Sequence, residues 1–131
     1  GQDCPCKGRI RDGRNYLFCL QGQTWQEARD TCIDRNLSLV IIDGAAENQW
    51  ITQMSRGLAN SNWWLGLSDT ETEGSFVWVD GSPIDYENWN DGEPNDWRRS
   101  EDCVEVVQQT GTWNDRGCQV DRPFVCEPIV P

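Results

Sequence analysis

The chain has 131 residues, of which 25% are charged and 37% are hydrophobic, which is typical of a single globular domain. Its formal net charge of −11 argues against nucleic acid as a partner, because nucleic acid binds basic surfaces. No apolar run approaches the roughly 18 residues of a membrane span, so no membrane insertion is expected. Residues 1–131 are therefore predicted to form one domain.

Seven cysteines in so short a chain predict disulfides, and hence a secreted or extracellular protein. Zinc is not expected, because the chain has no histidine and only one residue separates Cys4 from Cys6. The odd count leaves one thiol without a partner in the chain. That thiol is expected either to stay free or to link two copies as a disulfide-bonded homodimer.

The first half of the chain predicts alternating strands and helices. Residues 1–14 are expected to form an N-terminal extension, and residues 15–20 (Asn-Tyr-Leu-Phe-Cys-Leu) form a strand. Thr24 and Glu27 have the spacing of a capping box, so a helix is expected to run from Trp25 to about Arg35. An apolar strand follows over residues 37–42, and a second helix is expected from Ala45 to Gly57.

After Gly57 the helical period disappears and short strands take over. They are predicted at residues 63–67, 76–79 and 104–107, near 111–113, and at 123–126. Residues 81–100 are rich in Gly, Pro, Asn and Asp and predict a long loop of the kind that is often functional. Helices followed by short strands indicate an α+β domain.

Oxygen-bearing side chains crowd into residues 93–115. Like charges placed so closely repel one another, and a bound cation would remove that repulsion. Carboxylate and amide oxygens are the ligands that Ca²⁺ prefers. The residues concerned are Glu93, Asn95, Asp96, Glu101, Asp102, Asn114 and Asp115.

Several short motifs occur in an order and spacing that resemble the C-type lectin domain over nearly the whole chain. They are Thr24-Trp25 with Ala28 and Cys32, Ala46-Glu47-Asn48, Trp64-Leu65-Gly66-Leu67, Glu93-Pro94-Asn95, Trp113-Asn114-Asp115, and Cys118 with Cys126. The resemblance implies a double-loop α+β fold, in which two helices flank small antiparallel sheets and a long loop binds Ca²⁺. It also implies the bridges Cys32–Cys126 and Cys103–Cys118. Cys19 is expected to pair with Cys4 or Cys6.

The resemblance also implies two calcium sites. The principal site would use Glu93, Asn95, Glu101, Asn114 and Asp115. An accessory site would use Asp69, Glu73, Asp96 and Asp102, and it would share Glu101.

Such a principal site binds sugar directly. Two neighbouring hydroxyls would complete the coordination of the ion, donate hydrogen bonds to Glu93 and Glu101, and accept hydrogen bonds from Asn95 and Asn114. By resemblance, Glu-Pro-Asn favours mannose, glucose and fucose. Trp97 leaves galactose open as an alternative, because an aromatic ring at this position stacks on the apolar face of that sugar.

Two other functions compete with this interpretation. An enzyme is not expected, because the chain has no histidine for a catalytic triad. A glycosidase needs one carboxylic acid that stays protonated, whereas a carboxylate cluster that binds a cation favours the ionised form. A protein-binding or ice-binding module of the same fold, without sugar binding, remains the second alternative. Most of the tryptophans are expected in the core, namely Trp63, Trp64, Trp78, Trp89 and Trp113.

Overall fold

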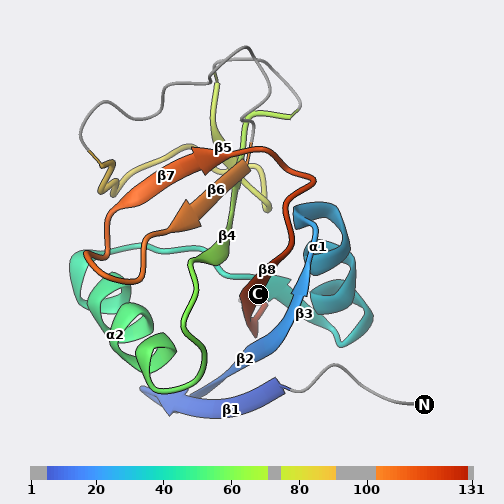
Figure 1. Cartoon of the computed structure of the whole chain (residues 1–131). Helices are drawn as coiled ribbons and strands as arrows, with labels where there is room; N and C mark the ends of the chain where they lie inside the picture. The colour runs from blue at the N-terminus through green and yellow to red at the C-terminus, as the bar shows by residue number, and fades with distance from the viewer. Residues whose placement is uncertain (1–5, 71–74, 91–102, 130–131) are drawn as a thin grey trace.

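A computed structural model describes residues 6–70, 75–90 and 103–129, and it confirms the predicted α+β class (Figure 1). Helices α1 and α2 flank the sheet on opposite sides. The helices are α1 (Trp25–Asp34) and α2 (Ala45–Arg56). The strands are β1 (Cys6–Arg11), β2 (Arg14–Gln23), β3 (Leu37–Leu39), β4 (Trp63–Ser68), β5 (Val77–Trp78), β6 (Cys103–Val106), β7 (Trp113–Arg116) and β8 (Arg122–Pro128).

The strands join into one mixed sheet. Along the main path the order is β1-β2-β8-β4-β6-β7, while β3 pairs with β8 and β5 pairs with β4. Every pairing is antiparallel except that of β4 with β8, which is parallel through Trp64 and Phe124. This parallel contact joins the lower half of the sheet (β1, β2, β3, β8) to the upper half (β4 to β7) in Figure 1.

Strand β1 lies within the residues that were expected to be an extension. It forms a hairpin with β2 around Asp12 and Gly13, whose φ angles of 52° and 78° suit a tight primed turn. An Asp-Gly pair between two strands is a hairpin signal, so the turn was readable from the sequence. The register places Cys6 opposite Cys19, and the two form a disulfide. The choice between Cys4 and Cys6 is thereby decided.

Helix α1 begins as its sequence predicts. The Glu27 backbone N–H donates to Thr24 Oγ1 at 3.2 Å, and the Thr24 N–H donates to Glu27 Oε1 at 3.1 Å. Trp25, Ala28 and Cys32 are the buried face. The Trp25 Nε1–H also donates to the Leu65 carbonyl at 2.8 Å, so the helix is joined to β4 by a hydrogen bond as well as by packing.

Strand β3 is shorter than the strand predicted for residues 37–42. The Val40 N–H still donates to the Val125 carbonyl of β8 at 2.9 Å, but the next N–H, that of Ile41, donates to the Glu127 carboxylate at 2.8 Å. The Val40 carbonyl instead accepts from the Gly66 N–H at 2.7 Å. A side chain therefore takes the place of a strand partner, which a pattern of apolar residues does not reveal.

Gly66 is required where β4 passes this segment. A Cβ at this position would lie 2.7 Å from the Leu39 carbonyl oxygen and 2.8 Å from that of Val40. Both atoms belong to the backbone and have little freedom to move. Glycine here allows β4 to approach the 39–40 segment closely.

Four of the five tryptophans expected in the core are buried there. Trp63, Trp64 and Trp113 are 0% exposed and Trp78 is 3% exposed. Trp89 is only partly buried, but its ring packs edge-on against Trp113 with a centroid separation of 5.8 Å. The tryptophans thus form much of the core beside β6 and β7.

Two further disulfides confirm the pairs that the family resemblance implied. Cys32–Cys126 ties α1 to β8, and Cys103–Cys118 ties the start of β6 to the segment after β7. Loop closure gives these bridges about 4.6 and about 3 kcal/mol of stabilisation. Within the described part of the chain, no helix has the length and apolar character needed to cross a membrane.

Candidate functional site

Three strands bring predicted calcium ligands to one end of the sheet. Ser68 of β4 lies opposite Cys103 of β6, and Cys103 lies opposite Arg116 of β7. Adjacent strands are about 4.8 Å apart, so the three ends span only about 10 Å. Asp69 follows Ser68, and Asp115 precedes Arg116. The sheet thus places one predicted accessory ligand and one predicted principal ligand near each other.

Both of these carboxylates are buried, which is unusual for aspartate. Asp115 is 0% exposed and Asp69 is 1% exposed. Removing a carboxylate from water is unfavourable unless polar groups or a cation compensate for the lost hydration. Their burial at the shared strand ends fits a site that a cation completes.

Asn114 is held by a hydrogen bond across the sheet. It lies opposite Glu105 in the β6–β7 register, and its Nδ2 donates to Glu105 Oε2 at 3.1 Å. This bond uses one of the two N–H donors of the amide and leaves Oδ1 as the acceptor end of the side chain. Oδ1 is the atom with which an asparagine ligates a metal.

The remaining predicted ligands lie outside the described residues and stay predictions. They are Glu73, Glu93, Asn95, Asp96, Glu101 and Asp102, together with Trp97 and the thiol of Cys4. In the sequence, Glu101 and Asp102 directly precede Cys103, the first residue of β6.

The predicted ligands that the structure describes have the right chemistry for calcium. Asp69, Asn114 and Asp115 offer carboxylate and amide oxygens, which suit a hard cation. Taken alone, residues 6–70, 75–90 and 103–129 contain no cluster of three acidic, histidine or cysteine side chains that could hold a metal. Asp69, Asn114 and Asp115 are three of the nine ligands that the sequence predicts, and the other six lie outside the described residues.

Glu105 is a site residue that the sequence interpretation overlooked. It is 0% exposed, yet it carries a charge in the middle of an apolar strand. Arg122 Nε donates to its Oε1 at 2.9 Å, and Arg116 Nη2 donates to its Oε2 at 3.2 Å. The signal was present in the sequence as a single glutamate among the valines of residues 104–107, with two arginines farther along the chain.

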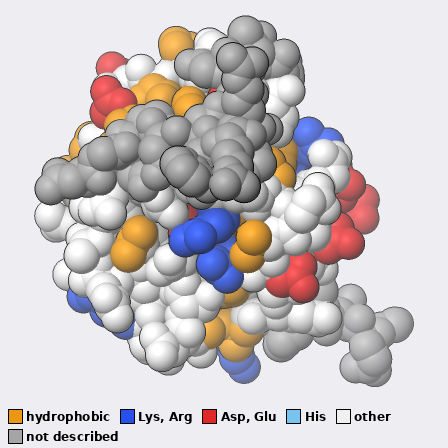
Figure 2. Space-filling view, turned by 45° about the horizontal axis from the view of Figure 1, so that its top comes forward, with side chains coloured by type: hydrophobic (Ala, Val, Ile, Leu, Met, Phe, Trp, Pro, Cys, Tyr) orange, Lys and Arg blue, Asp and Glu red, His pale blue; other side chains and the backbone are white. Residues whose placement is uncertain are grey.

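Arginine side chains therefore cover a buried carboxylate next to Asn114. The Arg116 and Arg122 side chains remain 38% and 24% exposed. Two guanidinium groups share one carboxylate, so this cluster is net positive in a strongly acidic chain. The face turned toward the viewer in Figure 2 has a group of Lys and Arg side chains near its centre, and its Asp and Glu side chains lie mostly toward the edge.

The Ala46-Glu47-Asn48 motif supports β7 from the other side. Asn48 Oδ1 accepts from Trp113 Nε1 at 2.9 Å, and Asn48 Nδ2 donates to the Gly111 carbonyl at 2.8 Å. Glu47 accepts from the Tyr16 hydroxyl at 2.8 Å. Asn48 thereby fixes the residue that precedes Asn114, so this motif has a structural role.

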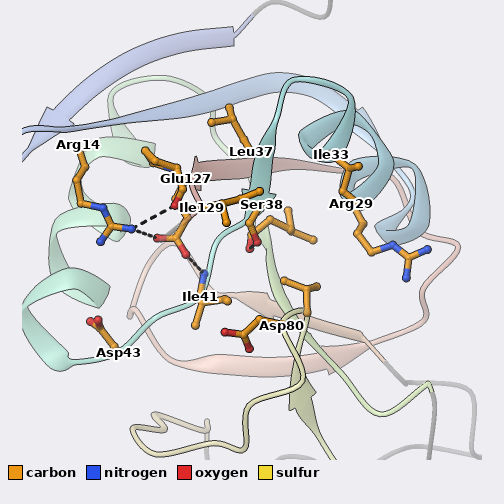
Figure 3. A pocket seen from close by; sticks show the side chains of 13 residues that line it. Arg14, Arg29, Ile33, Leu37, Ser38, Ile41, Asp43, Asp80, Glu127 and Ile129 are labelled. Carbon is orange, nitrogen blue, oxygen red and sulfur yellow. Dashed lines mark hydrogen bonds and ion pairs between the residues drawn. The ribbon is translucent and has the colours of Figure 1, made fainter. Parts of the chain in front are cut away.

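A separate cavity of about 510 Å³ lies between α1, β3 and the end of β8, and none of its described lining residues is a predicted calcium ligand. Figure 3 shows Arg14 and the Ile41 backbone beside the Glu127 carboxylate at one side of it. Burial raises the pKa of Glu127 to about 8, although the Ile41 N–H opposes that shift. Burial also raises the pKa of the nearby Glu47.

The comparisons with known proteins agree with this geometry. The family model "Lectin C-type domain" matches residues 21–128. The mouse low affinity immunoglobulin epsilon Fc receptor is 40% identical over 128 residues, which cover 96% of this chain and 37% of that protein. The chain spans less than two thirds of the length of such curated relatives.

Solved structures show the same fold. The carbohydrate-recognition domain of the mouse scavenger receptor C-type lectin superposes with a TM-score of 0.85 at 35% identity, covering 98% of this chain and 100% of that one. The corresponding domain of cow CD23, solved in the presence of a GlcNAc2Man3 oligosaccharide, gives 0.84 at 34% identity, with 98% of each chain covered.

A calcium-independent type II antifreeze protein also superposes, with a TM-score of 0.80. At 24% identity and 95% coverage of this chain, it shares the fold alone. The family model and the more similar relatives, by contrast, match the chain in both sequence and structure. The chain belongs to the C-type lectin domain family.

Proposed function

We propose that this domain binds carbohydrate through a calcium ion held by Glu93, Asn95, Glu101, Asn114 and Asp115. The observation that carries the proposal is the meeting of β4, β6 and β7, which brings Asp69 and Asp115 as buried carboxylates to one end of the sheet, next to Asn114. The family is generally calcium-dependent, and these side chains offer the oxygens that calcium prefers.

The protein side chains would do three things at this site. The carboxylates and the Asn oxygens hold the ion and leave coordination positions for a pair of sugar hydroxyls. Glu93 and Glu101 would accept hydrogen bonds from those hydroxyls, while Asn95 and Asn114 would donate hydrogen bonds to the hydroxyl oxygens. Binding is therefore lost when the carboxylates are protonated or the ion is removed.

For the sugar, we propose the mannose, glucose and fucose class. The support is Glu93-Pro94-Asn95 in the sequence, whose order favours neighbouring equatorial hydroxyls by family resemblance. Trp97 supports galactose as the alternative. We further propose that a second calcium binds at Asp69, Glu73, Asp96 and Asp102, with Glu101 shared between the two ions.

The proposed role is binding without catalysis, in an extracellular location. Three disulfides fit an oxidising compartment. Cys6 and Cys19 are paired, so Cys4 is the cysteine left over from the odd count. We propose that Cys4 links two copies of the domain, which would raise avidity for clustered sugars. A dimer on a non-reducing gel that Cys4→Ser abolishes is the expected result; a wild-type monomer would rule the link out.

Calcium-dependent retention tests the main proposal. Wild-type protein should bind mannose resin in millimolar calcium and elute with EDTA, and Asn114→Ala should not bind. Asn60→Ala, an exposed asparagine away from the site, is the matched control and should bind normally. Retention of the wild type in excess EDTA would refute the mechanism. Retention on galactose resin with no retention on mannose resin would show that the domain has the alternative, galactose-type specificity.

A further inference from the structure

The surroundings of Glu105 suggest a role beyond packing. Its carboxylate is fully buried and receives hydrogen bonds from four residues: Asn62 just before β4, Asn114 and Arg116 of β7, and Arg122 of β8. Oε2 accepts from Asn62 Nδ2 at 3.2 Å, from Asn114 Nδ2 at 3.1 Å, and from Arg116 Nη2 at 3.2 Å. Oε1 accepts from Arg122 Nε at 2.9 Å. Three of these partners hold the carboxylate, and the fourth is a predicted calcium ligand.

We propose that Glu105 is the positioning residue that sets which end of the Asn114 amide faces the ion. This inference rests on the proposed function, because it concerns Asn114 as a calcium ligand. An asparagine amide has two ends of similar shape, and only its oxygen can ligate a cation. A carboxylate accepts hydrogen bonds and donates none, so it holds the nitrogen and repels the oxygen. Glu105 therefore excludes the flipped amide, in which the nitrogen would face the ion.

The arginines and Asn62 make this positioning rigid. Arg116 and Arg122 compensate a charge that is otherwise unfavourable in a buried position. Asn62 connects the cluster to the segment after β6, because its Oδ1 accepts from the Gln108 N–H at 3.1 Å. The carboxylate cannot swing away from Asn114 without breaking hydrogen bonds to β7, to β8 and to Asn62 just before β4. The amide thus has its orientation before any ion arrives.

Two substitutions at Glu105 separate positioning from charge. Glu105→Gln keeps the length but offers an N–H in place of one oxygen, so its amide can bind Asn114 Oδ1 and turn that oxygen away from the ion. Glu105→Asp keeps the charge but withdraws the carboxylate by about 1.5 Å, which breaks the contact with Asn114. Both variants should raise the calcium dissociation constant about ten-fold or more, as loss of a supporting hydrogen bond to a metal ligand typically does.

Asn62→Ala is the matched control. It removes a different donor from the same Glu105 oxygen and touches no predicted ligand. It should lower the melting temperature of the calcium-free protein yet leave the calcium dissociation constant within about three-fold of wild type. If Glu105 has only a structural role, Asn62→Ala and Glu105→Asp should instead both weaken calcium binding, each in proportion to its loss of stability.

The measurements are calcium titration by calorimetry and thermal unfolding in EDTA, on protein with its disulfides intact. Weaker calcium binding by both Glu105 variants, with near-normal binding by Asn62→Ala, would support the inference. Wild-type affinity in Glu105→Asp would overturn it, since charge alone would then explain any effect of Glu105→Gln. If Glu105→Gln does not fold, Glu105→Asp decides alone. A wild-type chain that binds no calcium would instead refute the proposed function.

Discussion

Replacement of Gly66 by alanine tests the packing that places β4 beside the 39–40 segment. The added Cβ would lie 2.7 Å from the Leu39 carbonyl oxygen and 2.8 Å from that of Val40, well inside ordinary contact distance. Neither oxygen can rotate away as a flexible side chain could. The strand itself must therefore retreat by several tenths of an ångström.

The retreat has a second consequence. The Val40 carbonyl is also the acceptor of the Gly66 N–H, at 2.7 Å. Overpacking costs about 1–3 kcal/mol, and weakening this buried hydrogen bond adds about 1 kcal/mol. The free energy of unfolding should therefore fall by about 2–4 kcal/mol. For 131 residues, an unfolding entropy of about 2.1 cal/mol/K per residue converts this to a melting temperature lower by about 7–14 °C.

The matched control is Gly57→Ala at the end of α2. Gly57 has a helical backbone, with φ −85° and ψ −3°, and the nearest atom to an added Cβ is the Met54 carbonyl oxygen at 3.7 Å. Alanine there should be neutral or stabilise by up to about 1 kcal/mol. Differential scanning calorimetry compares the two variants. A Gly66→Ala protein that melts within 2 °C of wild type would refute the steric argument.

Three further predictions concern other parts of the fold. Glu127 keeps its proton to about pH 8 when folded but loses it near its ordinary value of 4.5 when unfolded, so the folded state binds more protons between these values. Stability contributed by this group is therefore full below pH 4.5 and declines as pH rises to 8. Between pH 5 and pH 8, the free energy of unfolding of Glu127→Gln should rise relative to that of the wild type by on the order of 3 kcal/mol, as measured by urea unfolding in EDTA. A difference between the two proteins that does not change with pH would contradict this. Thr24→Ala removes the capping hydrogen bond to the Glu27 N–H and should lower the free energy of unfolding by about 1 kcal/mol, whereas Thr24→Ser should preserve it. Replacing both Cys32 and Cys126 by serine should lower the melting temperature several times more than Thr24→Ala does, because that bridge closes a loop with a sequence separation of 94 residues; a loss no greater than that of Thr24→Ala would contradict the loop-closure argument.

The local elements were the most predictable part of the fold. The Thr24–Glu27 capping box and the start of α1 involve residues within one helical turn, so their interactions are written in the sequence. The start of α2 at Ala45 and its end before Gly57 were equally readable. Strand β1 is not among the predicted strands, although the Asp12-Gly13 pair is a hairpin signal.

The disulfide pairs could not be predicted from the spacing of the cysteines alone. The family resemblance supplied the pairs Cys32–Cys126 and Cys103–Cys118, and both are present. No sequence pattern chooses between Cys4 and Cys6, since the two cysteines are only two positions apart in the sequence. The hairpin register chose Cys6, because it places that residue directly across from Cys19.

The sequence by itself determined the identity of the candidate ligands. Their residue types and order along the chain pointed to calcium before any geometry was known. Only the tertiary structure decided which described residues meet, because contact between β4, β6 and β7 depends on strand order and register. The same register joins Glu105 to Asn114, a pair nine residues apart that no local rule connects. Sequence specifies the chemistry of each side chain, and packing of the whole chain specifies its neighbours.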